Sequence, residues 1–309
     1  MKKKKVYERP LIKPIVATMP GKSGNNVSLP LVAEIDGHTP SSLLKKFGSP
    51  LFLFSESTLR NNFKEAQSNF LNRYPNVCFA WSYKTNYLNA ICKIFHEEGA
   101  WAEVVSGFEY KKALQNGVRG TNIIFNGPNK SEEDLLLAID NESLIHIDNL
   151  QELILLSHLS ERCNKIVNVA IRVNLDAGIS PAWSRFGFNL ENGEAWRMVT
   201  KIIQEKKLNL KGLHCHIGTF ILSLNAYKVQ AKKMAALAEK IYNEDRAIVI
   251  IVIFRLFESF LMKRFKTVIS VKSTIASITQ NIIGKPRSTL NLDARLDCGV
   301  IFDDVFFLI

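Results

Sequence analysis

The chain has 309 residues, of which 47% are hydrophobic and 22% are charged, and its formal net charge is +11. This length suits one large α/β barrel, or one domain with a small appendage. The basic residues are scattered and no motif interleaves them with aromatic residues, so we expect no nucleic-acid partner. The longest apolar run, residues 247–254, is too short to cross a bilayer, so we also expect no membrane partner.

The five cysteines include no CxxC pair and no metal-ligand spacing, and their number is odd. Residues 1–5 are basic, but the apolar segment of a secretory signal does not follow them. Both features are typical of proteins from a reducing compartment, and we expect a cytoplasmic location.

Short β-rich runs alternate with helical patterns once the polar first segment has ended. The runs predict strands at residues 51–54, 77–83, 101–105, 122–126, 144–148, 166–173, 210–216 and 247–254. The segments between them predict helices at residues 56–71, 87–98, 107–116, 131–140, 150–159, 193–206 and 225–243. This repetition predicts a parallel sheet, and the number of units favours a (β/α)8 barrel over a doubly wound fold, which the pattern alone leaves open.

The regularity breaks after about residue 245. We expect a helix at residues 256–265 and a strand at residues 267–271 in this part of the chain. The apolar residues 305–309 look like an element cut short, and as an isolated strand they would form an unpaired edge.

Lys84 lies just beyond the apolar run at residues 77–81, which is typical of a buried parallel strand. At the carboxyl end of such a strand the lysine points into the mouth of an α/β fold, where active sites lie. Burial there lowers the pKa of an amine and makes it a nucleophile that forms Schiff bases. The alternative is a lysine that extends from the strand end into solvent.

Further polar clusters fall at the ends of other predicted strands, at residues 102–109, 126–130, 172–174 with 184–187, and 212–219. His214 and His216 alternate along a strand and so share one face, but no third ligand lies near them in sequence, and we expect no metal. A histidine on a strand is also commonly a satisfied polar group. Gly218 and Thr219 offer a backbone N–H group and a hydroxyl group suited to a phosphate.

In their order and rough spacing, these clusters resemble the fold-type III pyridoxal-phosphate decarboxylases. This group comprises the diaminopimelate, ornithine and arginine decarboxylases and is related in fold to alanine racemase. The resemblance runs from about residue 49 to residue 242. It is most specific in the His-x-His-Ile-Gly-Thr element that ends at residue 219, with Ser-Arg-Phe-Gly at residues 184–187. Diaminopimelate decarboxylase looks nearest, through EVVSGFEY at residues 103–110 and GLHCHIG at residues 212–218.

The resemblance implies pyridoxal 5'-phosphate as the cofactor and assigns catalytic roles to two residues. Lys84 would hold the cofactor through a Schiff base and later return a proton to the product. His216 would stack on the pyridine ring and set its plane.

The resemblance also implies cofactor-binding roles for residues around that pair. Glu103 stands where an aspartate is usual, near the lysine, and Arg172 would support the floor of the site. Gly218 and Thr219 would contact the phosphate. Ser106, Glu109 and Lys130 match family positions, but structural roles are left open for all three.

The later part of the chain departs from the family pattern. The family has a Gly-Gly-Gly loop after the seventh barrel strand and then a Glu-Pro-Gly-Arg motif, but this sequence has no glycine between Gly218 and Gly284 and no such motif. We therefore expect an N-terminal segment at residues 1–45, a cofactor-binding barrel at residues 46–285, and a remnant of the family's C-terminal β-domain at residues 286–309.

The resemblance predicts decarboxylation of an amino acid, either diaminopimelate-like or another diamino acid. One alternative is a catalytically impaired or non-catalytic homologue or fragment. Others are an alanine-racemase-like isomerase and a carrier of the cofactor. The partner is a small amino-acid substrate, and a homodimer like the family's is left open.

Overall fold

The structure is a computed structural model that describes residues 33–72, 76–179, 185–218, 221, 223–245, 250–253 and 305–308. The chain divides into two compact units, Met1–Leu53 and Phe54–Ile309. In the first unit, helix α1 (Pro40–Phe47) begins after Thr39, whose side chain accepts a hydrogen bond from the backbone N–H group of Ser42. The candidate site lies in the second unit.

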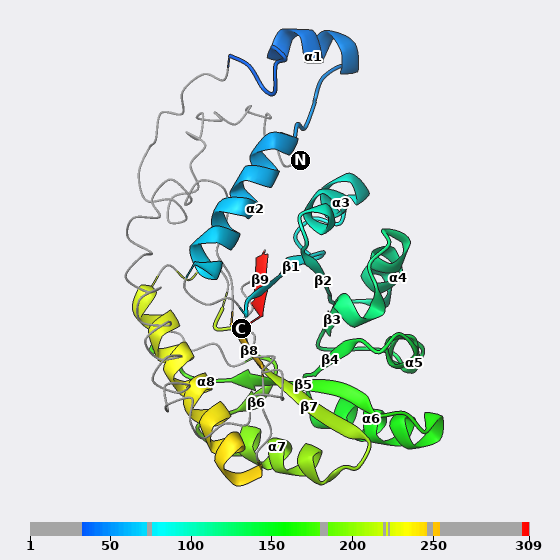
Figure 1. The fold of residues 1–309 in the computed structure, drawn as a ribbon, viewed down its shortest axis with the longest axis vertical. Helices are drawn as coiled ribbons and strands as arrows, with labels where there is room; N and C mark the ends of the chain where they lie inside the picture. The colour runs from blue at the N-terminus through cyan, green and yellow to red at the C-terminus, as the bar shows by residue number, and fades with distance from the viewer. Residues whose placement is uncertain are drawn as a thin grey trace, which may run out of the picture. The chain divides into compact units, whose positions relative to one another are not determined.

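The second unit alternates strands and helices along the chain (Figure 1). The helices are α2 (Glu56–Leu71), α3 (Asn89–Glu97), α4 (Gly107–Gln115), η1 (Gly120–Asn122), α5 (Glu132–Asp140), α6 (Leu150–Cys163), α7 (Glu194–Gln204) and α8 (Leu224–Asp245). The strands are β1 (Cys78–Ser82), β2 (Trp101–Val104), β3 (Ile123–Asn126), β4 (Leu144–Ile147), β5 (Val167–Asn174), β6 (Phe188–Asn189), β7 (Leu208–Cys215), β8 (Ile250–Ile253) and β9 (Val305–Leu308).

The predicted helices between residues 56 and 243 are confirmed, as are the predicted strands from residue 77 onward that fall on described residues. The strand predicted at residues 51–54 is wrong, because this run is irregular. Phe52 in this run is 88% exposed, so no sheet face buries its ring. The helix and strand predicted at residues 256–265 and 267–271 lie outside the described residues.

The sheet closes on itself. Strands β1, β2, β3, β4, β5, β7 and β8 pair in parallel in that order, and the β4–β5 pairing joins two parts of the ring. Strand β9 then pairs antiparallel with both β1 and β8. The short β6 pairs with β5 beside the ring. The predicted α/β barrel is therefore confirmed, with one antiparallel strand where an ideal (β/α)8 barrel has eight parallel strands.

Strand β9 corrects the expectation of an unpaired apolar edge at residues 305–309. Its backbone pairs with Cys78–Trp81 on one side and with Val252 and Ile253 on the other. A strand between β1 and β8 satisfies backbone groups that would otherwise form two open edges. The domain division predicted around residues 46, 285 and 286 stays a prediction.

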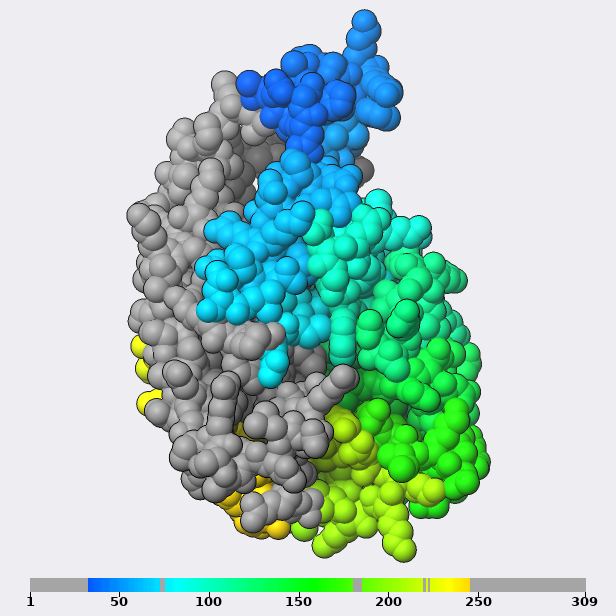
Figure 2. All heavy atoms as spheres, viewed as in Figure 1, coloured from blue at the N-terminus to red at the C-terminus, as the bar shows by residue number. Residues whose placement is uncertain are grey.

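Helices α3 to α7 lie on the outside of the strand ring (Figure 1), and their atoms form a continuous surface running from teal to yellow-green in Figure 2. The outward faces of the strands supply the main apolar core against these helices, including Val104, Phe125, Ile147 and Leu213. No helix in the described part of the chain is long and apolar enough to cross a membrane.

The helices that follow β2, β3 and β4 each begin at a side-chain cap. Ser106, Ser131 and Asn149 accept hydrogen bonds from backbone N–H groups three residues later, at 3.3, 3.1 and 2.9 Å. Such caps satisfy donors that have no partner within a helix. They also fix the loops at the carboxyl ends of these strands, where the predicted site residues lie.

Candidate active site

The interior of the barrel contains an apolar layer and, above it, a polar layer. Ala80, Ile124, Leu144 and Ala170 form the apolar layer from four different strands. Because side chains alternate along a strand, the residues two positions further on point to the same interior. In this register the polar layer comprises Ser82, Glu103, Asn126, His146, Arg172 and His214, none of which is more than 9% exposed.

Glu103 is the central acceptor on the β1–β3 side of this layer. Its Oε2 accepts a hydrogen bond from Ser82 Oγ at 2.5 Å, and its Oε1 accepts one from Asn126 Nδ2 at 2.9 Å. The same Oε1 lies 3.6 Å from Nζ of Lys84, whose side chain is 33% exposed. Lys84 is thus an exposed residue, and not the buried amine that the sequence predicted, but its Nζ lies beside a fully buried carboxylate that other side chains keep in place.

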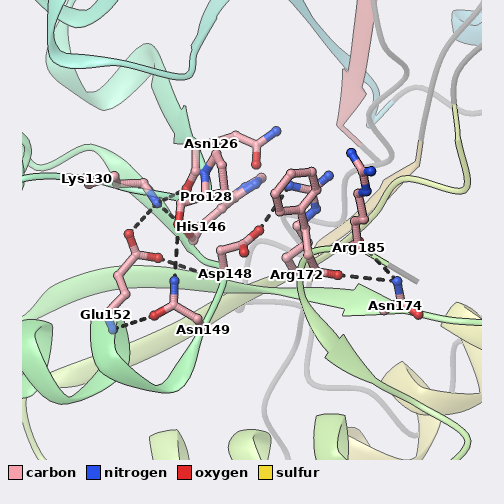
Figure 3. Close-up of polar contacts among 12 residues, drawn as sticks. Asn126, Pro128, Lys130, His146, Asp148, Asn149, Glu152, Arg172, Asn174 and Arg185 are labelled. Atoms are coloured by element: carbon pink, nitrogen blue, oxygen red, sulfur yellow. Dashed lines mark hydrogen bonds and ion pairs between the residues drawn. The ribbon is translucent and has the colours of Figure 1, made fainter. Parts of the chain in front are cut away.

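Arg172 is the corresponding centre on the β4–β5 side. Its Nη1 donates a hydrogen bond to Oδ1 of Asp148 at 3.0 Å (Figure 3). The ring of Phe186 covers the guanidinium group, with its centroid 4.9 Å from Cζ. Phe186 has a φ of +63° and Gly187 a φ of +75°, and a Cβ atom at Gly187 would lie 2.6 Å from the carbonyl oxygen of Arg172. The loop therefore needs glycine at this position to approach the strand closely.

Lys130 and Glu152 form a buried ion pair beneath the same strand ends (Figure 3). Lys130 Nζ donates to Glu152 Oε1 and to the carbonyl oxygens of Gly127 and His146, each at 2.7 Å. Glu152 Oε2 accepts from the backbone N–H group of Asp148 at 2.8 Å. Burial lowers the pKa of Lys130 and raises the pKa of Glu152, and their mutual attraction opposes both shifts. The pair joins the ends of β3 and β4 to the start of α6.

His146 and His214 face each other inside the barrel, with ring centroids 5.0 Å apart. Burial holds the pKa of each imidazole well below its usual range. The positive charges of Arg172 and Lys84 lower both pKa values further, and the charge of Lys130 also lowers that of His146. Both rings are therefore neutral at pH 7.

The remaining predicted site residues lie around this interior. His216 is half-buried, two residues beyond His214, at the end of β7. Gly218 is buried and has a φ of +132°, a conformation that favours glycine. Thr219 lies outside the described residues. No cluster of three or more metal-ligating side chains occurs among the described residues.

Ser106 and Glu109 form a helix cap. Ser106 Oγ accepts from the N–H group of Glu109, and Glu109 Oε2 accepts from the N–H group of Val105 at 2.8 Å. Glu109 thus accepts from the residue before the N-cap, one position away from the N–H group that the glutamate of a capping box contacts. The geometry supports the structural role that the sequence left open for both residues.

The sequence analysis gave no site role to Ser82, His146 or Asp148, and it placed Asn126 in a strand-end cluster without a role of its own. Ser82, Asn126 and His146 belong to the interior polar layer, and Asp148 holds Arg172. Applying period-two alternation to every predicted strand end would have found the layer. The partner of Arg172 depends on the pairing of β4 with β5, which alternation does not reveal.

Lys84 and Glu103 thus place an amine beside a buried carboxylate at the strand ends of an α/β barrel. A profile of the family described as pyridoxal-dependent decarboxylase, pyridoxal binding domain, matches residues 59–250, which is more than half of the chain. The chain belongs to this family, whose cofactor is pyridoxal phosphate. The resemblance predicted from the sequence is confirmed.

Curated relatives point to the same group. The diaminopimelate decarboxylase of Aquifex aeolicus is 28% identical over 214 residues, which cover 67% of this chain and 50% of the relative. That of Bacillus subtilis is 29% identical over 212 residues, which cover 65% of this chain and 48% of the relative. The chain spans about half the length of these relatives.

Solved structures share the fold. The crystal structure of diaminopimelate decarboxylase from Methanocaldococcus jannaschii aligns with a TM-score of 0.69 at 21% identity, covering 87% of this chain and 64% of that one. The enzyme from Helicobacter pylori complexed with L-lysine aligns with a TM-score of 0.67 at 18% identity, covering 85% and 65%.

The described residues fit pyridoxal phosphate. Lys84 supplies an amine suited to the cofactor's aldehyde, and Glu103 supplies a carboxylate beside that amine. Gly218 presents backbone at a position suited to a close approach by phosphate. In addition, the buried ring nitrogens of His146 have no hydrogen-bond partner among the described residues, so the interior offers polar atoms to a ligand.

Proposed function

We propose that this chain binds pyridoxal phosphate covalently at Lys84 and decarboxylates a small amino acid, either diaminopimelate or another diamino acid. The observation that carries the proposal is the 3.6 Å approach of Lys84 Nζ to the buried carboxylate of Glu103, at the carboxyl end of β1. The family match supplies the cofactor class, and the names of the relatives supply the substrate class.

When bound, the cofactor accepts the electron pair that remains on the substrate carbon as carbon dioxide leaves. Glu103 orients the Lys84 amine and holds a proton near Nζ through the charge of its carboxylate. Ser82 and Asn126 keep that carboxylate in one rotamer through hydrogen bonds to its two oxygens. Lys84 can then deliver a proton to the product from a fixed direction.

The rest of the site is proposed to position the cofactor. His216 would pack against the pyridine ring, while Gly218 and Thr219 would contact the phosphate. Arg172 supports the floor, and Asp148 fixes the guanidinium group in turn. The ring of Phe186 packs over the guanidinium group of Arg172.

A second candidate is a homologue that binds the cofactor without turnover. The sequence favours it because residues 254–304 contain neither the family's glycine triplet nor its Glu-Pro-Gly-Arg motif. The acid of that motif keeps the pyridine nitrogen protonated, and without it the cofactor is a poorer electron sink.

Absorption spectra and product analysis test both candidates. The purified chain with added pyridoxal phosphate is expected to show a visible absorption band that Lys84→Ala removes, and to release carbon dioxide from a diamino acid. A band without carbon dioxide from any diamino acid supports the second candidate. No band in the unmodified protein would refute both, and conversion of an L-amino acid to its D-form would instead indicate an isomerase.

A further inference from the structure

The proposed mechanism gives no role to His146, although this residue lies among those that carry it. His146 sits on β4 in register with Asn126 on β3, and its side chain is 1% exposed. Its backbone carbonyl accepts a hydrogen bond from Lys130, but neither nitrogen of its ring has a partner among the described residues. Its neighbours Lys130, Asp148 and Arg172 all form hydrogen bonds through their side chains.

The ring has unused hydrogen-bonding capacity. A neutral imidazole carries one N–H donor and one acceptor nitrogen, and leaving either unpaired in a buried position disfavours the folded state. A hydrophobic side chain of similar size would avoid this cost. The presence of a histidine here therefore points to a partner that the protein itself does not provide.

The position of the ring identifies that partner. His146 belongs to the same interior layer as Glu103, and the carboxylate of Glu103 contacts Lys84. Asn126 lies between them in the layer and donates to Glu103. Burial and three nearby cations keep the ring neutral at pH 7, so it can donate a hydrogen bond without carrying a charge.

We propose that His146 is a binding residue whose imidazole hydrogen bonds directly to a polar atom of the pyridine ring of pyridoxal phosphate. The inference rests on the proposed function, because it requires the cofactor to be held at Lys84. A water molecule bound permanently to the ring is the competing explanation.

Cofactor affinity and cofactor-free stability together test the inference. The variants are His146→Leu, which is close in volume and removes both nitrogens, and His146→Asn, which keeps a donor and an acceptor. His158→Leu makes the same exchange at an exposed position on α6 and serves as the control. Pyridoxal phosphate is titrated into each apo protein by absorption, and thermal unfolding is recorded without it.

We expect His146→Leu to bind the cofactor about fivefold to tenfold more weakly, the loss of one hydrogen bond. Its apo form should unfold at the same or a higher temperature. His146→Asn should keep more of the affinity, and His158→Leu all of it.

Unchanged affinity in His146→Leu would overturn the inference while leaving the proposed function intact. A markedly lower unfolding temperature of the apo variant, or failure to fold, would also overturn it, because the ring would then serve the fold through a bound water. If the unmodified protein binds no pyridoxal phosphate, the proposed function fails and the inference fails with it.

Discussion

The buried ion pair between Lys130 and Glu152 allows a sharp test of how the site is held together. In Lys130→Met the Nζ atom and its three hydrogen bonds are lost, and Glu152 remains as a buried carboxylate without its counter-ion. Removing one partner of a buried pair costs about 3–5 kcal/mol. This is a large part of the roughly 5–15 kcal/mol that stabilises a typical domain.

A double-mutant cycle separates the charge from the packing. Glu152→Gln keeps an acceptor for the backbone N–H group of Asp148 but removes the negative charge. Combined with Lys130→Met, it should restore at least about 1 kcal/mol relative to the sum of the two single variants. The free energy of unfolding is measured by urea denaturation of each variant.

A surface pair supplies the matched control. Lys111 Nζ lies 2.9 Å from Oε1 of Glu133, but the two side chains are 53% and 78% exposed. Water screens such a pair, so Lys111→Met should leave the unfolding midpoint unchanged within error. A cost below about 1 kcal/mol for Lys130→Met, or strict additivity in the cycle, would refute the reasoning.

Three other outcomes are expected. Gly178→Ala places an alanine with a left-handed backbone in open space, and it should lower the free energy of unfolding by roughly 1–2 kcal/mol. Gly187→Ala, at nearly the same φ, should cost more in urea denaturation because its Cβ meets a backbone oxygen. Equal costs would contradict the close approach of the Gly187 loop to β5. Tyr83→Phe removes a buried hydroxyl that lies 2.9 Å from Nε2 of His96 and 3.1 Å from Nδ2 of Asn116. It should lower the free energy of unfolding by about 1–3 kcal/mol, and no change would show that both partners find other hydrogen bonds. The pKa values of His146 and His214 lie far below 6.5 in the fold, so the unfolded chain binds more protons at acidic pH. As the pH drops below about 6.5, the free energy of unfolding should decrease by up to about 1.4 kcal/mol per pH unit for each ring. A free energy of unfolding that does not change with pH would contradict the burial of both rings as neutral groups.

Local patterns in the sequence predicted most of the barrel. The helix expected at residues 56–71 is α2, because its apolar periodicity marks the element; in the structure Ser55 caps its start. The strand end that carries Lys84 was predicted for similar reasons, since a continuous apolar run identifies a buried parallel strand. These signals depend on neighbours along the chain.

The features that sequence reasoning missed depend on distant pairings. Strand β9 closes the ring between β1 and β8, although many residues separate it from either strand in sequence. Asp148 follows a strand and precedes a helix cap, so nothing local marks it as the partner of Arg172. The strand predicted at residues 51–54 is wrong for a related reason: a β-rich composition does not form a strand without a neighbouring strand to pair with, and Phe52 in this run is exposed.

The central claim is that Lys84 holds the cofactor, and locating the attachment tests it most directly. The chain is incubated with pyridoxal phosphate, reduced with borohydride, digested and analysed by peptide mass spectrometry. The account predicts one modified lysine, Lys84, and no modification at the buried Lys130. A modified peptide from another position, or an unmodified Lys84 under saturating cofactor, would contradict it.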